Sequence, residues 1–324
     1  MNYIRTFRLS LLVIFIMVFA IHAQVVKVDE KIPPYKKQTG ISGNANSIGS
    51  DTMNNLMTLW LEGFRKYYPL VNIQIEGKGS STAPPALISG TAQFGPMSRE
   101  MKAKEIDEFE EKYGFAPTQI RTSLDALAIF VHKDNPLKSV SIEEADAIFS
   151  KTRKWGFAKD IITWGDLGLS ANWQNQPIRV FGRNSASGTY GFFKDEVLKK
   201  GDYKDTVKEQ PGSASVVQSV SEDQYAIGYS GIGYSTSGVR ALPLSKKKSD
   251  KVYDGNYDNV VSKKYPLARY LYLYIVVDPQ KPLDPLVKEF IKYVLSSEGQ
   301  QIVVKDGYLP LPYDVVMEEL KKLK

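Results

Sequence analysis

The sequence has no cysteine anywhere in its 324 residues. Without thiols the chain can form no disulfide, no thiolate nucleophile and no cysteine-ligated metal site. The same absence excludes a lipid anchor of the bacterial lipoprotein type, because that anchor is attached to a cysteine at the cleavage point. Any function must therefore come from other side chains and from the backbone.

Histidine is nearly as scarce, with only two in the whole chain. One of them, His22, lies in the N-terminal segment, so His132 is the single histidine of the remainder. One histidine excludes a multi-histidine metal site and leaves room only for a Ser-His-Asp arrangement. His132 ends an apolar run and precedes the turn signal 133–136, which favours a structural role.

Dense runs of one charge are also lacking. The formal net charge is +6, with 24% charged residues, and no basic cluster is interleaved with aromatics in the way that nucleic-acid binding requires. The basic run 246–248 is most simply a solvated loop. A composition of 43% hydrophobic residues over this length is that of a globular protein with room for two lobes.

A sustained apolar run occurs near the N-terminus and not in the rest of the chain. Residues 1–23 combine Arg5 and Arg8, the apolar run 9–21 and a small residue, Ala23, which is the pattern of a secretory signal peptide. An uncleaved anchor is the alternative, but the run is short for a bilayer span. We therefore expect cleavage near Ala23 and a soluble, periplasmic protein that is not a lipoprotein.

The remaining chain alternates between strand and helix patterns. Apolar residues recur at helical spacing from Met53 to Phe64, and residues 71–75 alternate with a period of two. Residues 24–38 are polar, contain Pro33-Pro34, and are expected to form an extended leader. The alternation predicts an α/β fold with largely parallel sheets.

Two long apolar strands, 124–132 and 269–277, bracket the middle third of the chain. A chain that leaves one lobe and later returns to it needs two such crossings. We therefore expect a discontinuous first lobe, residues 39–131 plus 267–324, and an inserted second lobe, residues 132–266.

Three turns rich in Gly, Ser and Thr each stand between a predicted strand and a predicted helix, at 49–52, 77–82 and 182–189. Ligands of open α/β sheets bind at the carboxyl ends of strands, and helix N-termini favour anions. Arg183 adds a fork of donors suited to an oxyanion. The turns match no glycine motif for nucleotides, so they predict a cleft for a small oxyanion held by many neutral donors.

At these turns the sequence resembles the extracellular phosphate-binding proteins of phosphate ABC transporters. The resemblance covers most of residues 43–310 and is carried by the segments 77–83, 94–99, 148–155, 182–189 and 226–229. It implies a two-lobed periplasmic-binding-protein fold of type II that closes over inorganic phosphate in the cleft. It further implies delivery to a membrane permease, a monomeric state, no enzymatic activity, no cofactor or metal, and no nucleic-acid partner.

The resemblance also implies which residues bind the phosphate. Those carried over by position as donors to the phosphate oxygens are Thr52, Ser80, Arg183, Ser187, Gly188 and Thr189. Arg183 would supply the charge-assisted hydrogen bonds.

Two positions depart from the pattern of many relatives. Ser98 stands where they have an aspartate, which accepts the proton of hydrogen phosphate and so rejects sulfate. We hypothesise that Asp51 takes this acceptor role, and the alternative is that Asp51 is only a helix N-cap. Ser185 stands where relatives have an aspartate that pairs with the arginine, so an acidic residue elsewhere would orient Arg183.

Three other functions stay open at this point. The Ser98 departure leaves a binding protein for sulfate, molybdate or tungstate as the first alternative. A hydrolase of phosphate esters is disfavoured, because Ser187 has no evident base partner. A surface phosphate sensor that never meets a permease is the third.

Overall fold

The computed structural model describes residues 26–323. The predicted signal peptide, residues 1–23, and its cleavage point lie outside this range. Within it, no helix combines the length and apolar character that a membrane crossing requires.

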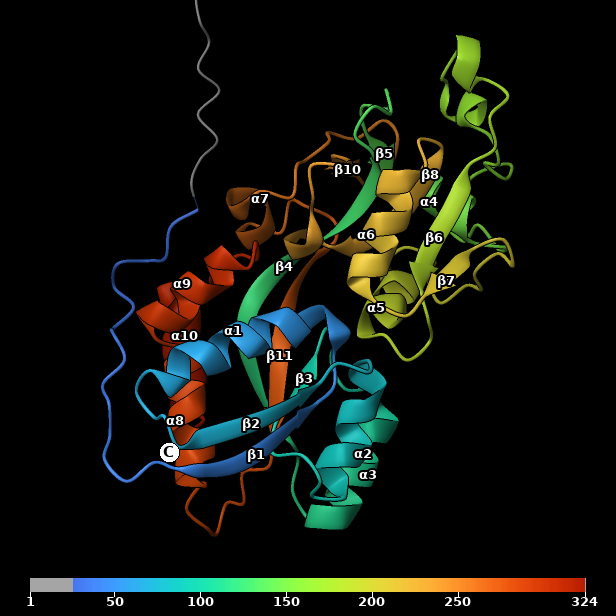
Figure 1. The fold of residues 1–324 in the computed structure, drawn as a ribbon. Coiled ribbons are helices and arrows are strands. Elements are labelled where there is room, and N and C mark those ends of the chain that lie inside the picture. The colour runs from blue at the N-terminus through green and yellow to red at the C-terminus, as the bar shows by residue number, and fades with distance from the viewer. Residues whose placement is uncertain (1–25, 324) are drawn as a thin grey trace, which may run out of the picture.

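The described chain forms two lobes stacked end to end (Figure 1). The first lobe is built from both ends of the sequence. Its elements are β1 (Gly43–Ile48), α1 (Asn54–Arg65), β2 (Val71–Glu76), α2 (Ala83–Ile88), β3 (Gly95–Met97), α3 (Ala103–Tyr113), α8 (Pro285–Val294), α9 (Ser297–Lys305) and α10 (Tyr313–Lys321).

The second lobe is built from the middle of the sequence. Its elements are β5 (Val140–Ser141), α4 (Ile142–Phe149), β6 (Arg179–Arg183), α5 (Gly188–Glu196), β7 (Lys208–Gln210), α6 (Ser213–Glu222), β8 (Ala226–Gly231), β9 (Val239–Ala241), β10 (Leu244–Ser245) and α7 (Tyr257–Val261).

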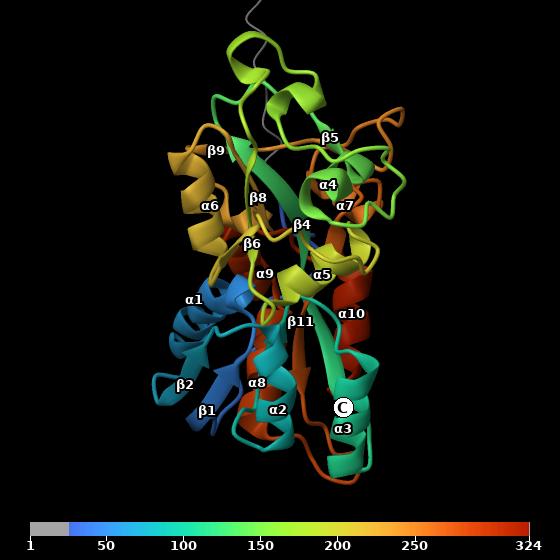
Figure 2. The same cartoon turned by 90° about the vertical axis from the view of Figure 1, so that its right-hand side faces the viewer.

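Two long strands, β4 (Thr118–His132) and β11 (Ala268–Ile275), connect the lobes, and we call them the hinge strands (Figure 2). They pair with each other over residues 118–126 of β4, whereas residues 127–132 of β4 pair with β8 and β9 of the second lobe. The strand order β3-β11-β4-β8-β6-β7 therefore runs from one lobe into the other. Both lobes are attached to one continuous sheet.

The prediction of largely parallel sheets is wrong for the centre of this sheet. The pairs β3–β11, β11–β4 and β4–β8 are antiparallel, whereas β1–β2, β5–β10, β6–β7 and β6–β8 are parallel. The reason is topological: the chain leaves the first lobe on β4 and returns on β11, so neighbouring hinge strands run in opposite directions. Helices α7, α9 and α10 were also not foreseen.

The first lobe is held by apolar packing beneath α1. Leu56, Met57, Trp60 and Phe64 recur at helical spacing and are fully buried. Helices α8 and α9 cover them, as Figure 1 shows, and Trp60 donates its indole N–H to the carbonyl of Gly299 at 2.9 Å. This packing holds the N-terminal end of α1 at the junction of the lobes.

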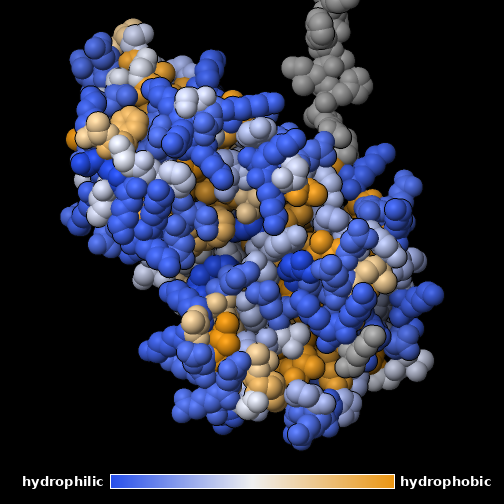
Figure 3. All heavy atoms as spheres, turned by 180° about the vertical axis from the view of Figure 1, so that it is seen from behind, coloured by the Kyte–Doolittle hydropathy of each residue, from blue (hydrophilic) through white to orange (hydrophobic). Residues whose placement is uncertain are grey.

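The leader segment lies against the first lobe. Tyr35 is buried, and its hydroxyl bonds to Tyr68 at 2.7 Å and to Glu289 at 2.8 Å. Seen from behind, most of the molecular surface is hydrophilic, and apolar side chains gather in the hollow between the lobes and at the lower end of the first lobe (Figure 3).

Candidate functional site

The three predicted turns meet at the junction of the lobes. The turns after β1 and β2 belong to the first lobe, and the turn between β6 and α5 belongs to the second. Thr52 Oγ1 lies 3.0 Å from Thr189 Oγ1, Ser98 Oγ lies 3.4 Å from Thr189 Oγ1, and Ser80 Oγ lies 3.3 Å from Ser98 Oγ. All four side chains are buried. We call this group the hydroxyl cluster.

Gly188 allows the two lobes to approach this closely. A Cβ atom added at Gly188 would lie 2.3 Å from Ser80 Oγ and 2.7 Å from Ser98 Oγ, both in the opposite lobe. Such distances are far below van der Waals contact, so a side chain at this position would hold the lobes apart. The glycine is therefore required by the contact between lobes and not by its own dihedral angles.

Ser187 is the N-cap of α5. Its Oγ accepts hydrogen bonds from the backbone N–H groups of Thr189 and Tyr190 at 3.1 and 3.3 Å. Capping fixes the first turn of the helix beside the hydroxyl cluster. The Ser187 hydroxyl hydrogen can still be donated, because a hydroxyl donates one bond while it accepts others.

Arg183, at the end of β6, is 1% exposed. Its Nη1 donates to Ser213 Oγ at 2.5 Å and its Nη2 to the carbonyl of Pro211 at 3.2 Å. Burial lowers the pKa of the guanidinium, and the Asp51 carboxylate opposes that shift. Nε is buried without a hydrogen-bond partner among the described residues. An unpaired buried donor on a cation is costly unless an acceptor is bound there.

Asp51 is the acidic residue that holds Arg183. Its Oδ2 lies 3.1 Å from Arg183 Nη2 and accepts the backbone N–H of Ser213 at 2.8 Å. Because Asp51 belongs to the first lobe and both partners to the second, this ion pair spans the junction. Asp51 is the first residue of the 3-10 turn 51–53, whose N-cap is Ser50, so Asp51 is not an N-cap.

Sequence reasoning missed two residues beside the cluster, Arg269 on β11 and Asp125 on β4. Arg269 Nη2 donates to Thr189 Oγ1 at 3.0 Å and to Asp125 Oδ2 at 2.7 Å. The available signal was a single charge near the start of each long apolar strand, 124–132 and 269–277, with opposite signs in the two. Buried charges of this kind are almost always paired.

The cluster lacks the groups that covalent or metal-assisted chemistry needs. His132 ends β4, and its Nδ1 accepts the backbone N–H of Asp134 at 3.2 Å within a turn of the second lobe. Across residues 26–323, no three His, Cys, Asp or Glu side chains are grouped so that they could hold a metal. Hydroxyls, helix N-termini and guanidinium groups converge instead, and these are donors for an anion.

The fold and the site define a two-lobed solute-binding protein. The chain belongs to the PBP superfamily, whose domain model matches residues 36–298. It is 55% identical over 299 residues to the phosphate-binding protein PstS of Pseudomonas aeruginosa, covering 92% of this chain and 93% of that relative. It is 30% identical over 288 residues to the PstS protein of Staphylococcus haemolyticus, covering 88% and 86%.

Solved structures share the fold at lower identity. A substrate-binding protein from Clostridium perfringens, solved with bound phosphate, matches with a TM-score of 0.70 and 24% identity, covering 83% of this chain and 100% of that one. An ABC-type phosphate transport receptor from Vibrio cholerae matches with a TM-score of 0.64 and 23% identity over the same shares. The expected type of fold is thereby confirmed.

Proposed function

We propose that this protein binds inorganic phosphate between its lobes and delivers it to the membrane permease of a phosphate ABC transporter. The observation that carries the proposal is the hydroxyl cluster at the junction of the lobes, together with Arg183, which pairs across that junction with Asp51 and whose buried Nε–H has no protein partner among the described residues. Relatives that are 55% or 30% identical over most of the chain are phosphate-binding proteins.

The assigned ligands follow the predicted set, with one change of role. Hydroxyl and backbone donors come from both lobes, and a bound anion would replace the contacts that these hydroxyls now make with one another. The donors are Thr52, Ser80, Ser98, Ser187, Gly188 and Thr189. Arg183 supplies the charge-assisted hydrogen bonds.

We assign to Asp51 the role of positioning Arg183. This replaces the role hypothesised from the sequence, in which Asp51 accepts the proton of hydrogen phosphate. Its Oδ2 lies 3.1 Å from Arg183 Nη2 and accepts the backbone N–H of Ser213, so the carboxylate is engaged by the second lobe. The position at which relatives discriminate phosphate from sulfate is then Ser98, whose neutral hydroxyl can both donate and accept a hydrogen bond.

The lobes are assigned as moving units, residues 39–131 plus 267–324 and residues 132–266, joined by the hinge strands. Contacts that cross between them, such as Ser81 N to the Ala186 carbonyl at 3.1 Å, would form on closure. The protein is not an enzyme, acts as a monomer without a nucleic-acid partner, and is exported to the periplasm after cleavage near Ala23, without a lipid anchor.

The test is calorimetric titration of the purified, anion-stripped protein with phosphate, sulfate, molybdate and tungstate. We expect one phosphate per chain, bound more tightly than the other three anions. If one of those three anions binds more tightly than phosphate, that anion is the physiological ligand. Absence of binding to all four would overturn the proposal. Turnover of a chromogenic phosphate ester would show that the protein is an enzyme.

A further inference from the structure

The hinge strands carry a buried ion pair next to the hydroxyl cluster. Arg269 and Asp125 face each other in the register of β11 and β4. Asp125 Oδ2 accepts from Arg269 Nε at 2.9 Å and from Nη2 at 2.7 Å, and both side chains are buried. We propose that Arg269 is a further binding residue for the anion and supplies a second guanidinium from the hinge. This inference rests on the phosphate site proposed above.

The guanidinium of Arg269 touches both walls of that site. Its Nη1 donates to the carbonyl oxygen of Ser98 at 2.9 Å, and its Nη2 donates to Thr189 Oγ1 at 3.0 Å. Ser98 belongs to the first lobe and Thr189 to the second, and both are assigned phosphate ligands. Arg269 is therefore in direct contact with one residue of the proposed site in each lobe.

Hydrogen-bond capacity remains on Arg269 for a ligand. A guanidinium has five N–H donors, and the bonds made within the described chain use four of them. One of those four goes to Thr189, a hydroxyl that can itself turn toward an anion. One Nη1 hydrogen is left, on the side of the group that contacts Ser98.

Asp125 fixes the guanidinium without facing the ligand. Its Oδ1 accepts the backbone N–H of Ile232 at 3.0 Å, while Oδ2 is occupied by Arg269. Both carboxylate oxygens are thus engaged by protein donors. A pre-oriented guanidinium loses little side-chain freedom when it binds an anion, which favours affinity.

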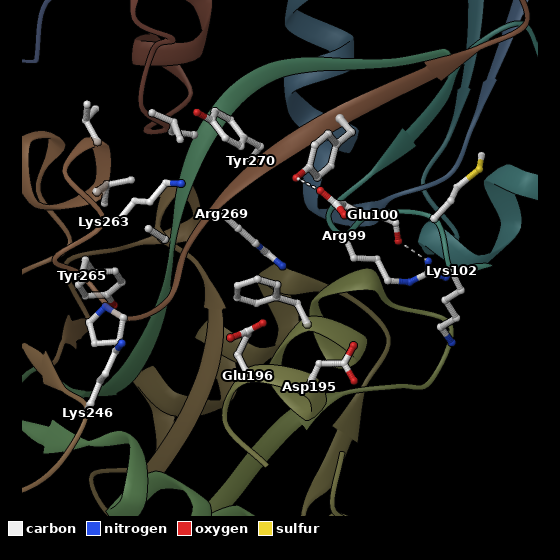
Figure 4. A pocket seen from close by; sticks show the side chains of 18 residues that line it. Arg99, Glu100, Lys102, Asp195, Glu196, Lys246, Lys263, Tyr265, Arg269 and Tyr270 are labelled. Carbon is white, nitrogen blue, oxygen red and sulfur yellow. Dashed lines mark hydrogen bonds between the residues drawn. The ribbon is translucent and has the colours of Figure 1, made fainter. Parts of the chain in front are cut away.

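On its other side, Arg269 lines a groove of about 690 Å³ between the lobes (Figure 4). Lys102, Lys246 and Lys263 also line this groove, and Phe192 lies under the guanidinium at 5.2 Å. Three carboxylates, Glu100, Asp195 and Glu196, line the groove as well, so its charge is mixed. Arg269 therefore stands between the hydroxyl cluster and this groove.

A purely structural role makes a different prediction. If the pair served only to join β4 to β11, a folded variant at Arg269 would bind phosphate as tightly as the wild type does. If Arg269 binds the anion, replacing its planar fork by an ammonium would weaken binding even though the charge is kept.

The experiment is calorimetric titration of inorganic phosphate onto the wild type and the variants Arg269→Lys and Arg269→Gln. The matched control is Arg121→Gln, because Arg121 stands on the neighbouring hinge strand β4 and pairs with the buried Glu319, away from the cluster. We expect a loss of about tenfold for Arg269→Lys and of at least about 100-fold for Arg269→Gln, with the control within about threefold of wild type.

Each outcome supports the inference or overturns it. If Arg269→Gln does not fold because Asp125 is left unpaired, Arg269→Lys, which keeps a cation opposite Asp125, is the deciding variant. Wild-type affinity in folded Arg269→Lys overturns this inference alone. An equal loss in Arg121→Gln also overturns it, because the effect would then belong to the hinge in general. Failure of the wild type to bind phosphate overturns the proposed function first.

Discussion

Two arginine–carboxylate pairs lie at the junction of the lobes, and they join different parts of the molecule. The Arg183–Asp51 pair connects the second lobe to the first, at 3.1 Å, and the Asp51 side chain is 24% exposed. The Arg269–Asp125 pair connects two neighbouring hinge strands, at 2.7 Å, and the Asp125 side chain is 0% exposed. One pair depends on the arrangement of the lobes, and the other does not.

The difference separates a contact that depends on lobe closure from one that is part of the fold. A contact between lobes is made only when they are together, so under the proposed function we expect Asp51 to act on the closed state and on ligand affinity. A contact between adjacent strands of the hinge exists in every arrangement of the lobes, so Asp125 acts on the fold. Arg183 and Arg269 are both buried, so the contrast lies in what each arginine meets when its partner is lost. Arg269 would stay buried in the hinge, which is strongly destabilising, whereas Arg183 would regain water when the lobes part.

The largest effect is expected for Asp125→Asn. Removing this carboxylate charge leaves Arg269 buried and unpaired, so the free energy of unfolding should fall by about 3–5 kcal/mol. The same change at Asp51 should cost less stability, because Arg183, although also buried, would regain water when the lobes part. Urea unfolding of both variants measures the two losses in the free energy of unfolding. Equal losses would contradict the proposed difference between the two ion pairs.

Arg183→Ala should weaken phosphate binding by about 2–5 kcal/mol, as truncation of a buried charge pair does. Calorimetry gives the value, and circular dichroism checks that the variant remains folded. A loss below about 1.4 kcal/mol, or tenfold, would mean that Arg183 is not in the site.

Gly188→Ala tests whether the lobes must touch. The added methyl would meet Ser80 and Ser98 of the opposite lobe, so phosphate affinity should fall by about 1–3 kcal/mol, the usual range for overpacking. Gly191→Ala, in the same helix, is the control, because its Cβ would meet only the flexible Arg99 side chain, at 3.3 Å. Comparable losses in both would point to the helix and not to the contact.

Asp51→Asn tests which role Asp51 has in the Arg183–Asp51 pair that spans the lobes. If Asp51 positions Arg183, affinities for phosphate and for sulfate should both fall, by about 1–2 kcal/mol, because the ion pair that holds Arg183 is lost. If Asp51 accepts the proton of hydrogen phosphate, the variant would lose its preference for phosphate over sulfate. Titrations with the two anions side by side separate these outcomes.

The sequence was sufficient to predict those parts of the site that lie within a single turn. Each of the three Gly/Ser/Thr turns stands between a strand and a helix, as predicted, because glycine, hydroxyl residues and hydrophobic periodicity act over a few positions. Ser80 and Thr189 lie in these turns, whereas Ser98 was indicated by the resemblance to phosphate-binding proteins. The three hydroxyls meet at one place.

The sequence was not sufficient for contacts that depend on register or on how the lobes meet. Arg269 and Asp125 are 144 positions apart, and their pairing follows from the alignment of β11 with β4. The partner of Arg183 was expected to be an acidic residue elsewhere, but only the meeting of the lobes identifies it as Asp51. The antiparallel hinge was missed for the same reason.

The most direct measurement is a crystal structure of the protein with inorganic phosphate. The account predicts one phosphate between the lobes, within hydrogen-bond distance of Arg183, Thr189 and the serines at 80 and 98. A phosphate bound elsewhere on the protein, with Arg183 still paired only to Asp51, Ser213 and Pro211, would contradict it.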